Sequence, residues 1–310
     1  MELRHLRYFV TVAEELHFSR AAARLYLTVP SLSQQIRVLE RHVGTPLFER
    51  DRRHVVLTEA GRLLLQHAEG LLANADRAMA EMRAYSAGLT GHLRIGLLIG
   101  NAANLTMPIL ESFRTTHPHV ELSFVTLDFA GQLSGLLGNR VDVAFVRPPL
   151  EDERLDVLTL AIEPRVAVVP ARSELADAEE LTVADVVDRP FIDRHGLAMP
   201  ASWTAFWLLT EERGGLDAHG PGSHRMMDSY ETVLLDIALH KTMTTVPACV
   251  GRATTDPAVK TIPLRGLECE IAVCSRRNDT SPLVGDFREI AAHTARQLIH
   301  TVPGGHLPGR

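Results

Sequence analysis

The sequence predicts an α/β protein with a small helical head, one long linker helix and a larger two-lobed α/β body. Three observations lead to this prediction. Apolar residues recur at helical spacing through residues 3–43. A second helical pattern covers residues 58–88, and strand-like and helix-like segments alternate from residue 91 onward. A chain of 310 residues is also long enough for two or more domains.

The composition is that of a globular protein, with 45% hydrophobic and 23% charged residues. No apolar run approaches the roughly 20 residues that span a bilayer. The N-terminus carries acidic residues where an export signal needs a cationic start and an uninterrupted apolar core. We therefore expect a cytoplasmic protein that makes no contact with a membrane.

Charge is distributed unevenly along the chain. Residues 1–62 contain ten arginines and seven acidic residues, a net charge of +3. Residues 91–310 contain twenty basic and twenty-eight acidic residues, a net charge of −8. This difference favours a polyanion that binds the head alone. Cys249, Cys269 and Cys274 form no metal-like cluster, so we expect inert buried thiols, no metal and no cofactor.

The head, residues 1–57, reads as three helices followed by a β-hairpin. The first helix begins at Leu3, and the second follows Phe18 with Ser19 as its expected N-cap. The third has Pro30 in its first turn and ends at Gly44. LFER and HVVL are strand-like runs on either side of Asp51-Arg52-Arg53. This order of elements is a winged helix-turn-helix.

The third helix has two different faces. Leu32, Ile36 and Leu39 form an apolar stripe. The opposite side carries hydroxyl, amide and guanidinium groups without an acid: Pro30, Ser33, Gln34, Arg37 and Arg41. Such groups can read base edges in a major groove, with the hairpin arginines on the DNA backbone or minor groove. The alternative is the solvated face of a helix in a small bundle.

The chain resembles the LysR-type transcriptional regulators over nearly sixty residues, LRYFVTVAEELHFSRAAARLYLTVPSLSQQIRVLERHVGTPLFERDRRHVVLTEAG. The motifs F-S-R-A-A, S-x-x-I-x-x-L-E, G-T-P-L-F-x-R and L-T-E-A-G are all present. The resemblance implies double-stranded promoter DNA as partner, bound by Ser19, Arg20, Thr28, Val29, Pro30, Ser31, Ser33, Gln34, Arg37, Arg41, Arg52 and Arg53. Val29 is a departure, because the family usually has Gln there. A direct amide contact is lost, although Val29 can touch a thymine methyl group.

The linker, residues 58–90, has Thr58 as an expected N-cap. Its apolar residues are spaced alternately by four and three positions: Leu64, Ala68, Leu71, Ala75, Ala78 and Met82. The spacing is typical of a helix that pairs with another helix, and packing of this helix on its own head is the alternative. The family resemblance implies a homodimer, and we expect a dimer of dimers, hence a homotetramer.

The body, residues 91–302, alternates strands and helices, which predicts a parallel, doubly wound sheet. FIDR, residues 191–194, reads as one of its strands. The family resemblance implies a two-lobed effector domain of the type 2 periplasmic-binding-protein fold. Lobe I is expected over residues 91–162 and 268–302, and lobe II over 163–267, with crossovers near Ile162–Arg165 and Leu264–Glu268. Residues 303–310 are assigned to a C-terminal tail.

Open α/β sheets bind ligands beyond the carboxyl ends of their strands, near helix N-termini. Segments at such positions give the expected effector-binding residues: Gly100, Asn101, Ala102, Thr126, Asp128, Arg147, Pro200, Ser202 and Trp203. Backbone amides at two helix starts and Arg147 favour an organic anion, most simply a carboxylate, and Trp203 can cover its apolar part.

Each of these assignments has an ordinary alternative. Arg147 can pair with Asp128 or Glu151 in a structural salt bridge, Trp203 can be a core residue, and Ser202 can be only an N-cap. His240 and Thr242 replace glycines that the family has before a strand, so His240 is either a pocket residue or a surface histidine.

Three functions compete for this sequence. A solute-binding protein lacks its export signal here, and an enzyme lacks a nucleophile elbow, a phosphate-binding loop or metal-spaced ligands. A transcription regulator controlled by a small molecule accounts for both the head and the body. It is not expected to be an enzyme, and RNA polymerase is a possible further partner.

Overall fold

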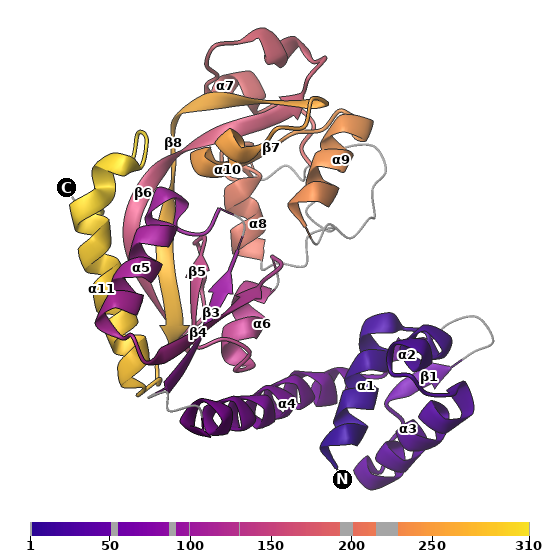
Figure 1. The fold of residues 1–310 in the computed structure, drawn as a ribbon. Coiled ribbons are helices and arrows are strands. Elements are labelled where there is room, and N and C mark those ends of the chain that lie inside the picture. The colour runs from indigo at the N-terminus through magenta and orange to yellow at the C-terminus, as the bar shows by residue number, and fades with distance from the viewer. Residues whose placement is uncertain are drawn as a thin grey trace. The chain divides into compact units, whose positions relative to one another are not determined.

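The computed structural model describes residues 2–50, 55–86, 91–98, 100–129, 131–192, 201–214 and 229–309 (Figure 1). The chain divides into an N-terminal unit, which includes residues 1–88, and a C-terminal unit with residues 89–137 and 141–310. Among the described helices, none is both long enough and apolar enough to cross a membrane.

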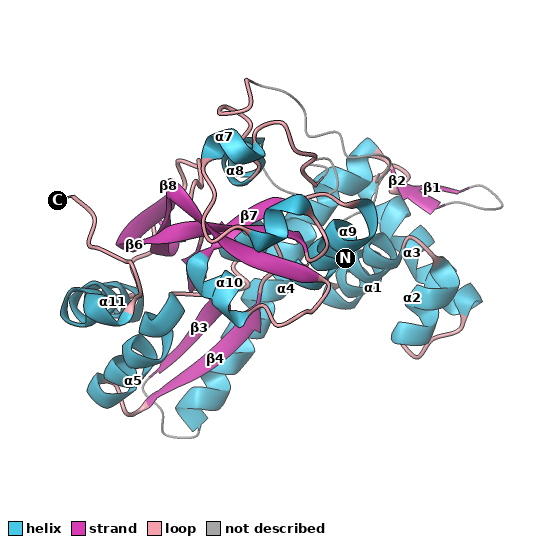
Figure 2. Ribbon diagram, turned by 90° about the horizontal axis from the view of Figure 1, so that it is seen from above, coloured by secondary structure: helices cyan, strands magenta, loops and turns pink. Residues whose placement is uncertain are grey.

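The N-terminal unit contains the three predicted helices, α1 (Leu3–Glu15), α2 (Phe18–Arg24) and α3 (Val29–Val43). The strands β1 (Phe48–Arg50) and β2 (Val55–Leu57) then pair in antiparallel register (Figure 2). Leu6, Phe9, Leu32, Ile36 and Leu39 are buried in one core that all three helices share. The predicted winged helix-turn-helix is therefore confirmed.

The linker helix α4 (Glu59–Ser86) starts where the sequence predicts. The Thr58 hydroxyl accepts a hydrogen bond from the Gly61 N–H at 2.9 Å, so Thr58 caps the helix. Gly61 lies so close to the head that a Cβ atom there would be 2.2 Å from the Leu47 carbonyl oxygen. The beginning of α4 is thus fixed against the head by a close backbone approach.

The C-terminal unit combines one mixed sheet with surrounding helices. Its strands are β3 (Gly91–Leu97), β4 (Val120–Thr126), β5 (Val143–Val146), β6 (Leu155–Pro170), β7 (Thr244–Pro247) and β8 (Val259–Arg276). Its helices are α5 (Thr106–Thr116), α6 (Gly131–Leu137), α7 (Val183–Val186), α8 (Ala201–Trp207), α9 (Tyr230–His240), α10 (Ala248–Ala253) and α11 (Pro282–Leu298).

The sheet has the order β4-β3-β5-β8-β6-β7. The strands β4, β3 and β5 are parallel, whereas β8 is antiparallel to β5 and β6, and β7 is antiparallel to β6. The expectation of a parallel sheet was therefore wrong for half of it. The reason is that β6 and β8 are long strands that pair from Leu155–Arg276 to Pro170–Val259 and run through both lobes. Of FIDR, residues 191 and 192 are described, and Phe191 forms an isolated bridge with Met243.

The two lobes have separate apolar cores. In lobe I, α5 and α11 lie side by side and cover one face of the sheet through Phe113, Phe145 and Phe287 (Figures 1 and 2), while α6 packs against β5 and β8 in a second cluster. In lobe II, α8 and α9 contribute Trp203, Trp207 and further buried residues to the largest cluster.

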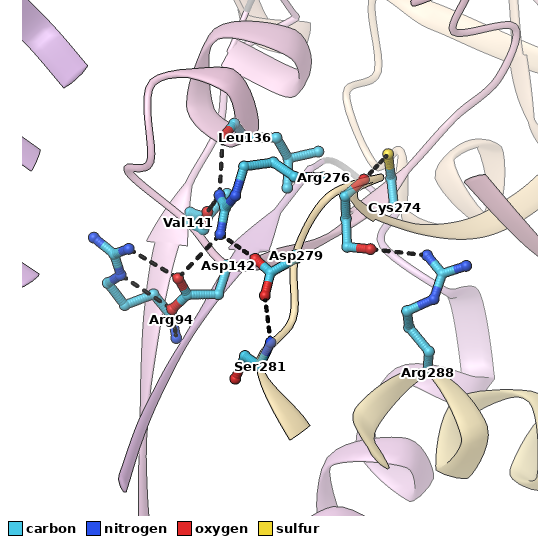
Figure 3. A network of polar contacts seen from close by, with 10 residues as sticks. Arg94, Leu136, Val141, Asp142, Cys274, Arg276, Asp279, Ser281 and Arg288 are labelled. Atoms are coloured by element: carbon cyan, nitrogen blue, oxygen red, sulfur yellow. Dashed lines mark hydrogen bonds and ion pairs between the residues drawn. The ribbon is translucent and has the colours of Figure 1, made fainter. Parts of the chain in front are cut away.

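Buried arginines of lobe I are neutralised by nearby carboxylates (Figure 3). Arg94 on β3 donates to both oxygens of Asp142 at 3.1 and 2.9 Å. Arg276 on β8 lies 3.5 Å from the same carboxylate and donates to the carbonyls of Leu136 and Val141. These contacts join β3, β8 and the segment between α6 and β5 in one network, so the network fixes the sheet of lobe I.

The predicted C-terminal tail is packed against a crossover between the lobes. His306 forms an antiparallel bridge with Ile162, and its Nε2 lies 3.1 Å from Glu268 Oε1. Both partners lie in the expected crossover segments. The last residues are thus part of the fold of the C-terminal unit.

Candidate functional site

Helix α3 presents its polar face to solvent. Leu32, Ile36 and Leu39 are buried, and the expected base-reading positions are exposed or half-buried: Thr28, Val29, Pro30, Ser31, Ser33, Gln34, Arg37 and Arg41. The hydroxyl of Thr28 accepts a hydrogen bond from the Ser31 N–H at 3.3 Å and caps the helix. Gly44 ends it with φ of 81°, a left-handed conformation that glycine adopts freely.

The acidic residue of α3, Glu40, is half-buried and lines the same depression as Gln34, Arg37 and Arg41. Glu40 Oε1 accepts hydrogen bonds from the Leu47 and Phe48 N–H groups at 3.0 and 3.4 Å. Its carboxylate is therefore used to position the start of β1. The exposed side chains of this face carry no acid, so the face is neutral to basic.

The start of α2 differs from the prediction. His17, not Ser19, is the N-cap, because its Nδ1 accepts hydrogen bonds from the Ser19 and Arg20 N–H groups at 3.2 and 3.4 Å. Ser19 is exposed. The Arg20 guanidinium donates to the Glu15 carboxylate at 3.1 Å, so this pair has to separate before Arg20 contacts a phosphate.

Tyr26 is a residue of this surface that the sequence reasoning missed. It lies in the turn between α2 and α3 with φ of 56°, and its side chain is 97% exposed. An aromatic side chain exposed to this degree, in the turn before α3, adds a phenol hydroxyl to the exposed surface of the head. The tyrosine in the turn LYLTV was the available signal. Arg52 and Arg53 lie outside the described residues.

The seam predicted on α4 is split between two roles. Leu64 and Ala68 pack into the core of their own head, and Ala68 is fully buried. For these two positions the expected dimer contact was wrong, because α1 covers them. Leu71 and Met82 are 46% and 59% exposed, and Ala75 and Ala78 are half-buried and exposed. The second half of the helix therefore has an apolar stripe that remains available.

A cavity with a volume of about 50 Å³ lies where the two lobes meet. Lobe I contributes Leu98, Phe129 and Arg147. Lobe II contributes the remaining lining residues: Ile192, Trp203, Trp207, Leu208, Tyr230, Val233, Thr244, Thr245, Val246, Pro247 and Val250. The cavity is thus mainly apolar and aromatic, as small-molecule sites usually are.

Arg147 joins the lobes but does not carry a free charge. Its Nη1 donates to Glu163 Oε1 at 2.7 Å, and the two side chains are 2% and 0% exposed. Glu163 Oε2 accepts the Cys249 N–H at 2.9 Å. The alternative of a structural salt bridge is confirmed, although neither Asp128 nor Glu151 is the partner. Glu163 is 16 residues away on β6, and no local pattern could have indicated it.

Among the described members of the expected effector-binding set, Arg147 and Trp203 line the cavity, whereas Asn101 lines a separate depression on lobe I. The amides of Asn101, Ala102 and Ala103 already donate within the chain, to Leu98 O, Thr106 Oγ1 and Gly100 O. Gly100 has φ of 75°, Thr126 is exposed and Ser202 is half-buried. Asp128 accepts the Gly131 N–H at the start of α6. Pro200 lies outside the described residues.

The two tryptophans of α8 differ in their hydrogen bonds. Trp203 Nε1 donates to the Arg147 carbonyl at 2.8 Å, which links the lobes, whereas Trp207 Nε1 is buried with no partner within the described part of the chain. Behind Trp207, the buried Arg165 donates to the Phe206 carbonyl at 2.8 Å, and its guanidinium lies 4.3 Å from the Phe206 ring centroid. Burial lowers the pKa of Arg165 to about 10. Arg165 therefore ties the C-terminal end of α8 to β6.

His240 does not line the cavity, so of its two alternatives the pocket residue is not the one found in the structure. Its Nδ1 lies 2.9 Å from Asp236 Oδ1, and the second oxygen of Asp236 accepts the Thr242 hydroxyl at 3.1 Å. Lys241 between them adopts φ of 57°, the conformation that glycine usually supplies. The two departures from the family pattern thus form one polar turn at the end of α9.

The cysteines are free thiols, and burial raises the pKa of Cys249 to about 11 and those of Cys269 and Cys274 to about 12. We expect native protein at pH 7 to resist iodoacetamide, because the reactive thiolate is scarce well below these pKa values. Mass spectrometry of native and denatured samples measures this difference. Rapid labelling of native Cys249 at neutral pH would contradict the expectation.

No group of three His, Cys, Asp or Glu side chains in the described segments is placed to bind a metal ion. The arrangement therefore offers two kinds of surface in the described residues. One is an exposed polar helix face on a winged helix-turn-helix, and the other is an apolar cavity between two α/β lobes.

A winged helix-turn-helix joined to such a two-lobed body defines a class of proteins, the DNA-binding regulators that carry a ligand-binding domain. The model for "Bacterial regulatory helix-turn-helix protein, lysR family" matches residues 3–62, and the LysR substrate binding domain matches residues 86–296. The chain belongs to the LysR family of DNA-binding transcriptional regulators.

Individual relatives agree with this assignment. The chain is 31% identical over 292 residues to the HTH-type transcriptional regulator AlsR of Bacillus subtilis, which covers 94% of this chain and 95% of AlsR. The crystal structure of CbnR, a LysR family transcriptional regulator, superposes with a TM-score of 0.65 at 24% identity, covering 95% and 99% of the two chains. The crystal structure of full-length CbnR complexed with its target DNA superposes with a TM-score of 0.61 at 24% identity, covering 95% of this chain and 100% of the CbnR chain.

Proposed function

We propose that this regulator acts in the cytoplasm, where α3 reads promoter DNA in the major groove and a small molecule in the cavity between the lobes controls the outcome. The observation that carries the proposal is the exposed face of α3, which holds Gln34, Arg37 and Arg41 while its only acid, Glu40, is turned toward β1. Amide and guanidinium groups pair with base edges, and an acid on that face would repel phosphate.

The roles of individual residues in the proposed complex follow from exposure. Gln34 and Arg37 contact base edges, and Val29, 39% exposed, contacts a thymine methyl group. Arg41, Ser19 and Tyr26 hold the backbone, and the hairpin arginines Arg52 and Arg53 do the same from the wing. CbnR, a relative of the same fold, has been solved with its target DNA, which supports this mode of binding.

Dimerisation through the second half of α4 completes the proposal. The head covers Leu64 and Ala68. The rest of the apolar stripe keeps the alternating spacing of four and three positions: Leu71, Ala75, Ala78 and Met82. Two paired heads read two half-sites, and two such dimers form the proposed tetramer. A change in the spacing of the heads then alters DNA bending and the access of RNA polymerase.

The Leu71→Glu variant is expected to lose self-association, because a carboxylate placed in an apolar helix seam is desolvated without a partner. Analytical ultracentrifugation should show a shift toward monomer, with operator affinity reduced at least tenfold. Gln66→Glu is the matched control, since Gln66 is exposed on the same helix, away from the stripe. Unchanged association of Leu71→Glu would place the dimer contact elsewhere.

The cavity is the proposed effector site because its walls come from both lobes and Arg147 and Trp203 connect them. A ligand shifts the lobes only by its differential affinity for two arrangements. The prediction that the effector is a carboxylate loses its main support. Glu163 neutralises Arg147, and the backbone amides of residues 101–103 already donate hydrogen bonds within the chain.

Footprinting of the full-length protein on DNA upstream of its own gene tests the proposal. At low ionic strength it should protect a site with two similar half-sites. Val233→Trp, which places a larger side chain in the cavity, should leave that footprint unchanged while the response to the inducing metabolite is lost. A full-length protein that ignores this DNA would refute the regulatory function. A response that survives in Val233→Trp would place the effector outside this cavity.

A further inference from the structure

We infer that the cavity between the lobes takes an uncharged aromatic molecule that carries a neutral hydrogen-bond acceptor, such as an amide or ester carbonyl. This inference rests on the proposed function, since it names the chemical class of effector for that site. Three properties of the lining lead to it: its charge balance, its unpaired N–H groups and its aromatic side chains.

Among the described lining residues, the charge is already balanced. Arg147 is the one described lining residue with a permanent charge, and Glu163 Oε1 lies 2.7 Å from its Nη1 with both side chains buried. Tyr230 is the other ionisable group in this described lining, and burial raises its pKa, so it stays neutral at pH 7. A carboxylate brought into this cavity would be desolvated without a free cation, which makes its burial unfavourable. A neutral ligand leaves the Arg147–Glu163 pair balanced.

Arg165 does not supply the missing cation. Its Nη2 donates to the Phe206 and Trp207 carbonyls at 2.8 and 3.4 Å and to the Thr245 hydroxyl. Its guanidinium also lies 4.3 and 5.1 Å from the ring centroids of Phe206 and Trp207. The positive charge of Arg165 thus interacts with the C-terminal end of α8, where the carbonyls of the helix carry partial negative charge.

Two buried N–H groups of lining residues lack an acceptor. Arg147 Nε and Trp207 Nε1 have no hydrogen-bond partner among the residues that the structure describes. An unpaired buried N–H is unfavourable, and a ligand oxygen that pairs with it removes this penalty. Both N–H groups are covered by protein in this structure, so the proposed contact requires the side chain to shift when the ligand binds. The same cavity offers the rings of Phe129, Trp203 and Trp207, with Phe129 and Trp203 centroids 5.4 Å apart. A planar ring with a carbonyl group matches both features.

Trp203 and Trp207 are the only two tryptophans of the chain, so intrinsic fluorescence reports directly on this cavity. We would titrate the full-length protein at pH 7 with benzamide and benzoate, and with cyclohexanecarboxamide and cyclohexanecarboxylate. Benzamide should change the fluorescence in a saturable manner, with an affinity at least tenfold above those of the other three probes.

Two variants test the role of the unpaired N–H. Trp207→Phe keeps a ring and removes the donor, so benzamide affinity should fall about tenfold. Trp203→Phe is the matched control, because its N–H already donates to the Arg147 carbonyl, and it should lower the melting temperature more than it lowers benzamide affinity.

The outcomes separate this inference from the proposed function. Tighter binding of benzoate than of benzamide, or no saturable change with either amide, overturns the inference. Equal affinity of Trp207→Phe and wild type for benzamide overturns the assignment of the donor. Footprinting on the same protein preparations tests DNA binding and does not depend on the results for the ligands. A wild-type protein that gives no footprint refutes the regulatory function instead.

Discussion

Replacing Glu163 with alanine is expected to lower the free energy of unfolding of the C-terminal unit by about 3–5 kcal/mol. The variant leaves the Arg147 guanidinium, whose side chain is 2% exposed, without a carboxylate, and it removes the acceptor of the Cys249 N–H. Removing one partner of a buried ion pair is costly because the remaining charge stays desolvated. Chemical denaturation followed by tryptophan fluorescence measures the change.

A surface pair and a double variant complete this experiment. Glu180 pairs with Arg265 while their side chains are 39% and 71% exposed, so Glu180→Ala should change stability by less than about 1 kcal/mol. Replacing both residues of the buried pair, with Glu163→Gln and Arg147→Met, should recover much of the loss. If Glu163→Ala proved as mild as Glu180→Ala, Arg147 would have to be solvated in solution.

The second large effect is expected in the head. Arg37→Ala should weaken binding to the specific operator by about 1–3 kcal/mol, or roughly 5- to 150-fold, because a guanidinium that pairs with a base edge discriminates by this amount. Binding to unrelated DNA should change far less. Titrations with both DNAs at one fixed salt concentration measure the ratio of the two affinities.

Arg4→Ala controls for the loss of one positive charge, since Arg4 lies on α1 and pairs with Glu2 at 3.0 Å. It should leave the ratio of specific to non-specific affinity unchanged. An Arg37→Ala protein that loses equal affinity for both DNAs would show that Arg37 contacts phosphate and does not read a base.

Local signals were sufficient to predict the head. Pro30, Gly44 and the apolar stripe of Leu32, Ile36 and Leu39 belong to α3 and its cap, so terminal residues and periodicity define the ends of the helix and its buried side. The N-cap of α2 was assigned to the wrong residue because a histidine ring can accept the same hydrogen bonds as a serine hydroxyl. His17 precedes Ser19 by only two residues.

Contacts between distant segments were beyond a local pattern. The partner of Arg147 was sought at Asp128 and Glu151, near it in sequence, and it is Glu163 on a strand that belongs to both lobes. For the same reason, a run such as VAVVP in β6 does not show how far its strand continues. A helix as short as α10, with six residues, holds too little periodicity to be predicted from the sequence.

The packing of the last residues has a practical consequence for protein engineering. His306 pairs with Ile162, and Gly304 lies so close to Pro164 that a Cβ atom would be 2.8 Å from its ring. A purification handle or fluorescent reporter fused directly to residue 310 would lie close to the crossover strand that these residues contact. A fusion of that kind should be separated by a flexible Gly/Ser spacer, so that the attached cargo exerts no force on the crossover.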